Sequence, residues 1–277
     1  MTLQRPKDPS FCIITPTAYL NQYASLSDTH LVLAHLIDHN EQYTSFYKTL
    51  SDHGDFVIMD NGAFELGQSY EPSKLIELGY KCGANVIVLP DYPYESSAKT
   101  ISAAKLWADM IKDAGFHTCF VPQSKTSDIA DWIKAYEWAA NSELVDMIGM
   151  SILGIPNAWN HIPAPYARVV ATEVLQQLDL FADHKHHHYL GLNAGPKLEI
   201  PALIQMGALD SCDSSNPVWS GILGHEYSYN TDSFLSVSKP KKEVDFDYRL
   251  TRDVDTHRRI QHNIDLTLQL FNTDETL

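Results

Sequence analysis

The chain has 277 residues, of which 44% are hydrophobic and 20% are charged. This composition fits one soluble globular domain with a substantial core, and no apolar run reaches the roughly 20 residues that a membrane-spanning helix needs. The first residues lack the apolar core of a secretory signal, so we expect a cytoplasmic protein. The net charge of -15 argues against a surface that binds polyanions throughout.

Cysteines and basic residues give two local expectations. The four cysteines lack the close spacings of a metal or disulfide cluster, so buried thiols in a reducing compartment are expected. Positive charge is concentrated near the C-terminus, which predicts either a local contact with nucleic acid or a solvated charged face. The basic residues there are Lys239, Lys241, Lys242, Arg249, Arg252, Arg258 and Arg259.

Short apolar runs alternate with helical patterns along most of the chain, which favours βα units around a parallel sheet. Eight such runs are present, and eight strands close a (β/α)8 barrel, the TIM barrel fold of the α/β class. The predicted strands are residues 11–15, 31–36, 56–60, 85–90, 118–122, 146–151, 188–193 and 208–212.

Helical periodicity and capping residues predict the intervening helices. The helix at 72–82 is followed by Gly83, and Ser127 and Asp128 are candidate N-caps of a helix that begins near Ile129. The other predicted helices are residues 41–53, 97–114, 166–181 and 200–206.

Two segments interrupt this repeat. Residues 154–165 contain three prolines and predict a long loop after the sixth strand. Residues 184–188 read H-K-H-H-H. We expect a solvated loop there rather than a metal site, because consecutive imidazoles in a loop point in different directions.

The C-terminal part predicts an extension packed on the barrel. Residues 214–247 are rich in turn residues and are expected over the barrel mouth, and residues 252–271 predict a closing helix. We therefore divide the chain into a barrel core at 1–213 and an extension at 214–277, which together form a single domain.

Polar residues follow several of the predicted strands. Asp60, Asp91 and Gln123 each come directly after an apolar run, and Asp210 and Asp213 lie at the last one. Because barrel enzymes keep their chemistry at the carboxyl ends of the strands, these residues predict an active site. Each carboxylate, taken alone, is equally well explained as a turn residue after a strand.

The same residues carry a resemblance to a known family. The sequence D-N-G-A-F-E at 60–65 is similar to the D-S-G-G-[FY]-Q motif of the tRNA-guanine transglycosylases. Asp91 resembles the family's carboxylate after strand four, Gln123 its glutamine after strand five, and G-M-S at 149–151 its G-L-A turn. The chain looks most like the shorter 7-deazaguanine DNA transglycosylases of phages and bacterial genomic islands.

The resemblance continues to the end of the chain. The sequence Y-L-G-L-N-A-G-P at 189–196, followed by G-A-L-D-S-C-D at 207–213, resembles the family's Y-L-M-G-V-G-x-P and G-V-D-M-F-D. Residues 261–265, Q-H-N-I-D, resemble the H-N-L of its last helix. Each piece is short, but together they cover the barrel in the family's order.

Two departures from the family change what we expect. The family's zinc site needs a C-x-C-x-x-C cluster, and no cysteine follows Cys212, so we expect neither that zinc nor any other metal or cofactor. His262, which matches the zinc-binding histidine, should then pack or form hydrogen bonds. The chain also ends without an additional RNA-binding domain, which favours DNA over tRNA as the partner.

The resemblance implies exchange of guanine for a 7-deazaguanine such as preQ0 by double displacement. Asp213 would be the nucleophile that forms a covalent intermediate with the sugar, with Asp210 as the reserve candidate. Asp60 would be the general acid and base.

Base recognition would use the other matched residues. Asp91 would accept hydrogen bonds from N1-H and the 2-amino group of guanine, and Gln123 with the backbone N-H groups of Gly149, Met150 and Ser151 would bind the 6-oxo group. Phe64 would stack on the base. Asn61, inside the first motif, is a further substrate-binding candidate.

Three alternatives stay open. The enzyme could act on tRNA, the barrel could be a non-catalytic subunit that presents nucleic acid to a partner, or it could be a nucleoside glycosidase, which suits the acidic charge. A partner protein or a homodimer is also compatible with the sequence, because an acidic enzyme of nucleic acids benefits from a basic partner.

Overall fold

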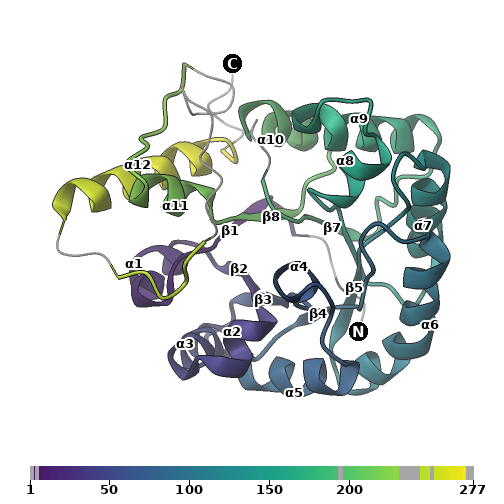
Figure 1. Ribbon diagram of the computed structural model, residues 1–277, viewed down its shortest axis with the longest axis horizontal. Coiled ribbons are helices and arrows are strands. Elements are labelled where there is room, and N and C mark those ends of the chain that lie inside the picture. The colour runs from purple at the N-terminus through teal and green to yellow at the C-terminus, as the bar shows by residue number, and fades with distance from the viewer. Residues whose placement is uncertain (1–2, 4–5, 193–195, 231–243, 250–252, 273–277) are drawn as a thin grey trace.

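The computed structural model describes residues 3, 6–192, 196–230, 244–249 and 253–272. Eight parallel strands form a nearly closed barrel surrounded by helices, so the predicted TIM barrel is confirmed (Figure 1). The strand order in the sheet is β1-β8-β7-β6-β5-β4-β3-β2. The barrel would close between β1 and β2, for which no hydrogen-bonded pairing is described. The strands are β1 Ser10–Ile13, β2 Thr29–Val32, β3 Phe56–Met59, β4 Val86–Val88, β5 His117–Phe120, β6 Met147–Gly149, β7 His186–Tyr189 and β8 Ser211–Ser214.

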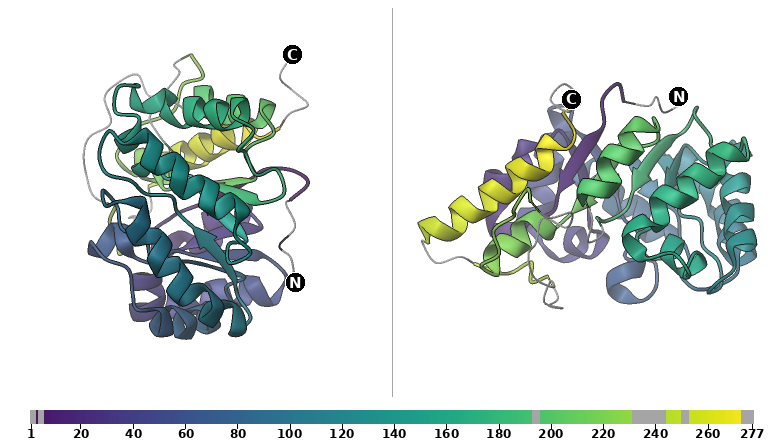
Figure 2. Two further views of the ribbon diagram at one scale, coloured as in Figure 1. Left: turned by 90° about the vertical axis from the view of Figure 1, so that its right-hand side faces the viewer. Right: turned by 90° about the horizontal axis from the view of Figure 1, so that it is seen from above.

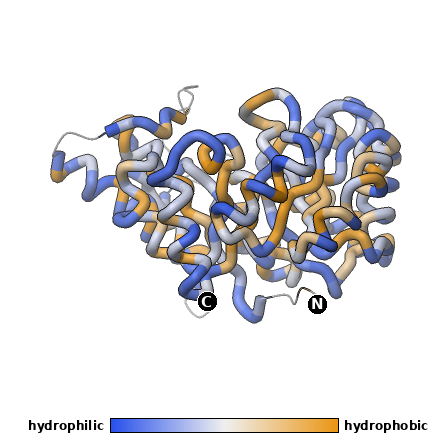
Figure 3. The backbone as a smooth tube through the Cα atoms, turned by 90° about the horizontal axis from the view of Figure 1, so that it is seen from below, coloured by the Kyte–Doolittle hydropathy of each residue, from blue (hydrophilic) through white to orange (hydrophobic). Residues whose placement is uncertain are grey.

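Alternation along each strand separates the barrel interior from the layer under the helices. Cys12, Ile58, Val88, Cys119 and Met147 pack together inside the barrel. Their sequence neighbours belong to a larger apolar layer between the sheet and the helices. Apolar segments accordingly run through the middle of the molecule, and hydrophilic segments prevail on its outside (Figure 3).

The helices follow from caps and apolar periodicity. Asp128 accepts a hydrogen bond from the N-H of Asp131 at 3.0 Å and caps α7, as predicted, whereas Ser127 has a positive φ and does not cap it. The longer helices are α3 Glu41–Asp52, α5 Pro72–Cys82, α6 Ser97–Asp113, α7 Ile129–Asn141, α9 Ala164–Gln177, α10 Pro196–Gln205 and α12 Val254–Gln269. The shorter ones are α1 Leu20–Tyr23, α2 Ala34–His39, α4 Ala63–Leu66, α8 Gly154–Ala158 and α11 Asn216–Ile222.

The predicted bounds of several strands, among them the second, seventh and eighth, and one predicted loop are wrong. The second strand ends at Val32, because α2 begins at Ala34 and takes the rest of the apolar run. The segment predicted as a loop at 154–165 contains α8, and α9 starts at Ala164. The N-H groups of Leu153 and Gly154, at the start of α8, donate to Oγ of Ser151.

The prediction of a solvated loop at 184–188 is also wrong. His186, His187 and His188 lie in β7 and are at most 3% exposed. Imidazole is buried here at low cost because each ring has a hydrogen-bond partner. His186 and His188 bond Ser211 inside the barrel, whereas His187 faces the helices and bonds the hydroxyl of Tyr136 at 2.8 Å.

The C-terminal extension completes the helical layer beside β1 and β8. Helices α11 and α12 pack on each other next to α1, and Nδ1 of His257 lies 2.5 Å from the hydroxyl of Tyr23 (Figures 1 and 2). The expected role of His262 is confirmed, since its Nε2 bonds the carbonyl oxygen of Tyr227 at 3.0 Å. The expected division at residue 213 falls inside β8.

Part of the extension reaches the barrel mouth. Phe246 packs against the interior cluster, and its carbonyl oxygen accepts a hydrogen bond from Thr17, just past β1, at 3.0 Å. Residues 231–243, within the segment expected over the mouth, lie outside the described part. Among the helices of the described residues, none has the length and apolar composition needed to cross a bilayer.

Candidate active site

The predicted site residues lie at or near the ends of five of the eight strands. Asp60 follows β3, Asp91 follows β4 and Gln123 follows β5. Ser151 follows β6, and Asp213 lies near the end of β8. Because all strands of the sheet are parallel, the residues at these strand ends line one end of the barrel.

Asp60 is half-buried at the start of a tight turn. Its Oδ2 accepts a hydrogen bond from the N-H of Gly62 at 3.0 Å. Gly62 has a φ of 82°, a conformation that other residues adopt at a cost. This glycine therefore lets the chain turn sharply after β3 with the carboxylate held at the turn.

Asp91 is the centre of a buried hydrogen-bonded group. Its Oδ1 accepts from Nδ2 of Asn61 at 2.8 Å, and its Oδ2 accepts from Nε2 of Gln123 at 2.6 Å. Burial raises the pKa of Asp91 above its usual value, and the two amide hydrogen bonds oppose that rise. Asn61 also bonds the carbonyl oxygen of Leu89, so its side chain supports Asp91.

Gln123 offers a different atom from the one expected. Its Nε2 donates a hydrogen bond to Oδ2 of Asp91, because an ionised carboxylate can only accept hydrogen bonds. Its Oε1 is buried and has no partner among the described residues. In this arrangement the free atom of Gln123 is an acceptor, and binding a 6-oxo group would require the amide to turn away from Asp91.

The turn after β6 contributes backbone. The N-H of Met150 is donated to the carbonyl oxygen of His188 at 2.7 Å, whereas the N-H of Ser151 has no described partner. Ser151 is therefore the donor in this turn that remains for a ligand. Gly149 is required for packing, since a Cβ there would lie 2.8 Å from Cγ2 of Val121 and 3.0 Å from Cδ1 of Leu190.

Phe64 projects from the turn after β3. It lies in α4, between Gly62 and Gly67, and its side chain is 72% exposed. In Figure 1 this short helix lies across the middle of the barrel view. The ring is not buried in the core, so it is accessible to a flat ligand at the barrel end.

Asp213 is buried, and both of its described hydrogen bonds go to Oδ1. The donors are the N-H of Gly191 at 2.8 Å and Nε2 of His188 at 3.2 Å. Within the described residues Oδ2 is the oxygen left for a substrate. Asp210, by contrast, precedes β8 at its amino end, where Oδ2 accepts from the N-H of His187 at 2.7 Å.

The carboxylates also raise the pKa values of two buried thiols, Cys119 and Cys12. Burial first, and then the charges of Asp60 and Asp91, raise the pKa of Cys119. Burial and the charge of Asp213 likewise raise the pKa of Cys12. Both thiols therefore stay protonated at neutral pH.

A buried clamp, which sequence patterns did not indicate, holds the turns after β6 and β7. Arg168 of α9 forms two hydrogen bonds with Glu199, at 2.6 and 2.7 Å. It also donates to the carbonyl oxygens of Met150, Leu190 and Gly191 at 2.7 to 3.1 Å. An arginine inside an amphipathic helix usually faces solvent, so the sequence offered no signal for this clamp.

The basic residues near the C-terminus lie only partly within the described part of the chain. Arg258 pairs with Glu226 at 2.7 Å, and Arg259 bonds the hydroxyl of Thr256 at 2.6 Å. Arg249 is exposed. Lys239, Lys241, Lys242 and Arg252 lie outside the described residues.

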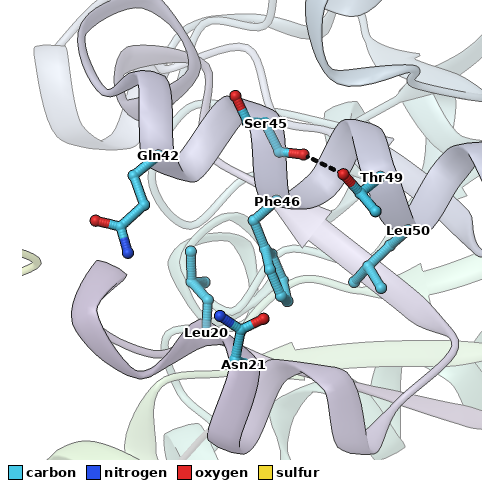
Figure 4. A pocket seen from close by; sticks show the side chains of 7 residues that line it. All are labelled: Leu20, Asn21, Gln42, Ser45, Phe46, Thr49 and Leu50. Carbon is cyan, nitrogen blue, oxygen red and sulfur yellow. Dashed lines mark hydrogen bonds between the residues drawn. The ribbon is translucent and has the colours of Figure 1, made fainter.

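One further feature, a cavity, lies away from the predicted site residues. A cavity of about 320 Å³ lies between α1 and α3, and none of the predicted site residues lines it (Figure 4). Its lining contains no ionisable side chain.

Among the described residues, no group of three or more His, Cys, Asp or Glu is placed to hold a metal ion.

Comparison with protein-family models and with curated proteins finds no match. Among solved structures, the chain is similar to an HpcH/Hpal aldolase/citrate lyase family protein from Burkholderia cenocepacia, with 12% identity, a TM-score of 0.51, and coverage of 78% of this chain and 92% of that one. It is also similar to the catalytic domain of a chitinase from Pyrococcus furiosus, with 14% identity, a TM-score of 0.52, and coverage of 97% and 98%. At these identities the likeness establishes the barrel fold alone.

Proposed function

We propose that this protein is a guanine transglycosylase that exchanges guanine in DNA for a 7-deazaguanine such as preQ0. The observation that carries the proposal is the pairing of Asp91 with Gln123 between two further carboxylates, Asp60 and Asp213, at one barrel end. A base-sized ligand held by the pair would have a carboxylate on either side.

The carboxylates suit a double displacement. Oδ2 of Asp213 attacks the anomeric carbon as the glycosidic bond breaks, and guanine leaves with the bonding electrons and a proton from Asp60. The incoming base returns a proton to Asp60, and its nitrogen attacks the same carbon and releases the carboxylate. Two inversions retain the configuration at the sugar.

The buried acceptors suit guanine. Ionised Asp91 accepts hydrogen bonds from N1-H and the 2-amino group, which adenine cannot offer together. Oε1 of Gln123 provides a further acceptor, and the N-H of Ser151 suits the 6-oxo group. Leaving such buried acceptors unpaired costs about 1–3 kcal/mol each, so a base without matching donors is rejected.

The depth of the site implies that the nucleotide leaves the helical stack. Asp91 is 7% exposed and Gln123 is 2% exposed, so a base paired inside a duplex cannot reach them. Phe64, exposed on α4, is available to stack on the extruded base.

The test is base exchange with labelled preQ0 and labelled guanine, offered with duplex DNA, single-stranded DNA and unmodified tRNA. Label entering DNA supports the proposal, and label entering only tRNA assigns the same chemistry to the other polymer. No incorporation into any polymer contradicts the proposal.

A nucleoside glycosidase is the second candidate. The net charge of -15 and the internal pairing of Arg258 favour a small neutral substrate over a polyanion. That enzyme would release base without an acceptor base, and its substrate affinity would hardly change with salt, whereas DNA affinity falls steeply as salt rises.

A further inference from the structure

A chain of hydrogen bonds crosses the barrel interior and ends on Asp213. Nε2 of His186 lies 2.8 Å from Oγ of Ser211, and the same hydroxyl lies 2.7 Å from Nδ1 of His188. Nε2 of His188 lies 3.2 Å from Oδ1 of Asp213. His186, Ser211 and His188 are at most 3% exposed.

The chemistry of the four groups fixes where the protons lie. An ionised Asp213 accepts only, so Nε2 of His188 carries the hydrogen between them. In a neutral imidazole Nδ1 is then an acceptor, and the hydroxyl of Ser211 donates to it. The oxygen of Ser211 can in turn accept from Nε2 of His186. Every link has one donor and one acceptor, and all of them point toward Asp213.

A second donor acts on the same carboxylate oxygen. The N-H of Gly191 reaches Oδ1 of Asp213 at 2.8 Å, and the carbonyl oxygen of Gly191 is held by Nη2 of Arg168 at 2.7 Å. Two donors from different directions restrict rotation of the carboxylate about its last bond. Among the described residues, both donors bond Oδ1, which leaves Oδ2 for a ligand.

We propose that His188 is a positioning residue for Asp213, and that the His186-Ser211 pair fixes its tautomer. The catalytic consequence rests on the proposed function, in which Oδ2 of Asp213 bonds the sugar. His188 then holds Oδ1 during attack, and stabilises the carboxylate that is released when the second base arrives. A misplaced nucleophile lowers kcat while the base-binding groups stay intact.

The alternative is that His188 only fills and satisfies the barrel interior. Neighbouring His187 provides the matched control, because it lies in the same strand, is equally buried and bonds Tyr136 on the opposite face. A purely structural role predicts similar effects from replacing either histidine. A positioning role predicts that only His188 affects catalysis beyond its effect on folding.

The first experiment compares His188→Leu, His188→Gln and His187→Gln in the folded state. We expect about a hundredfold loss of kcat in His188→Leu with KM for the base unchanged, because only positioning of the nucleophile is lost. Glutamine can place an N-H near the lost Nε2, so His188→Gln should recover part of the rate. His187→Gln should keep the wild-type kcat. Equal kcat in wild type and His188→Leu, or equal losses at both histidines, would overturn the inference.

A second readout does not depend on activity. Side-chain ¹⁵N NMR reports which nitrogen of His188 carries the proton, with His188→Gln used to assign the signals. We expect the Nε2-H tautomer, and the Nδ1-H tautomer would overturn the inference. If the wild type exchanges no base, the proposed function fails, and the tautomer still decides whether His188 donates to Asp213.

Discussion

Nε2 of Gln123 lies 2.6 Å from Oδ2 of Asp91, and both side chains are buried at the ends of the neighbouring strands β5 and β4. This contact determines whether the site offers hydrogen-bond donors or acceptors to a ligand. As long as Asp91 is ionised, Gln123 must turn its N-H toward it and its carbonyl oxygen away. The pair then presents acceptors, and a ligand that fits it must bring donors.

Base affinity should fall at acid pH. Burial raises the pKa of Asp91 above its usual value, and the acceptor is lost as pH drops through that raised pKa. Below it, affinity for a soluble 7-deazaguanine should fall by about tenfold per pH unit, measured by calorimetry. Asp91→Asn should bind weakly at every pH. Affinity that is constant from neutral to acid pH in the wild type would contradict this role.

At Asp91, a fall in pH affects folding stability in the opposite direction from base affinity. Because the folded-state pKa of Asp91 lies above the unfolded value, protonation favours the folded state at this residue as pH falls. Weaker base binding at acid pH would therefore not arise from unfolding at Asp91.

Adding one methyl group at Gly149 should disturb the turn after β6. In Gly149→Ala the new Cβ would meet Cγ2 of Val121 at 2.8 Å, and relieving this overlap should cost about 1–3 kcal/mol of unfolding free energy. Urea denaturation measures the loss. Val121→Ala added to Gly149→Ala makes room for the methyl and should recover part of it. A double variant no more stable than the sum of the two single losses would show that the overlap is not the cause.

Removing the buried clamp should destabilise the protein strongly. Arg168→Met leaves Glu199 buried and unpaired, which should cost about 3–5 kcal/mol in chemical denaturation. Replacing both residues, as Arg168→Met with Glu199→Leu, should restore much of that stability. The double variant should still exchange base slowly, because the carbonyl oxygen of Gly191 loses its donor. Wild-type stability in the single variant would show that Glu199 finds another partner.

Replacing Phe64 separates stacking from stability. The side chain is 72% exposed, so Phe64→Ala should change the unfolding free energy by no more than about 0.5 kcal/mol. Loss of stacking should weaken binding of a flipped base by about 1–3 kcal/mol, measured with DNA that carries an unpaired guanine. Phe64→Trp keeps a flat ring and should bind normally. Unchanged affinity in Phe64→Ala would exclude this residue from the base contact.

The sequence predicted the barrel because its signals are local. Helix α5 has its predicted bounds, since Pro72 and Gly83 mark its two ends. The strand at 56–60 and the cap at Asp128 were likewise predicted within a residue or so. The prediction of strand ends from apolar runs was wrong where a strand and a helix share one run. An example is Val32, where β2 ends and α2 follows.

The polar interior of the barrel could not be predicted in the same way. Three consecutive histidines are typical of an exposed segment, and only their partners Ser211, Asp213 and Tyr136 make burial possible. Those partners lie 23 to 51 residues away in the chain. The positions of Asp60, Asp91 and Gln123 after strands were predicted, but the orientation of the Gln123 amide depends on Asp91.

The most direct test of the proposed mechanism replaces the nucleophile. Asp213→Asn keeps the size of the side chain but cannot form the covalent intermediate, and its rate of labelled-base incorporation into DNA should fall at least about a thousandfold. Asp210→Asn is the matched control at the other end of β8, and it should retain exchange. Wild-type incorporation by Asp213→Asn, with Asp210→Asn inactive, would contradict the assignment and move the nucleophile to Asp210.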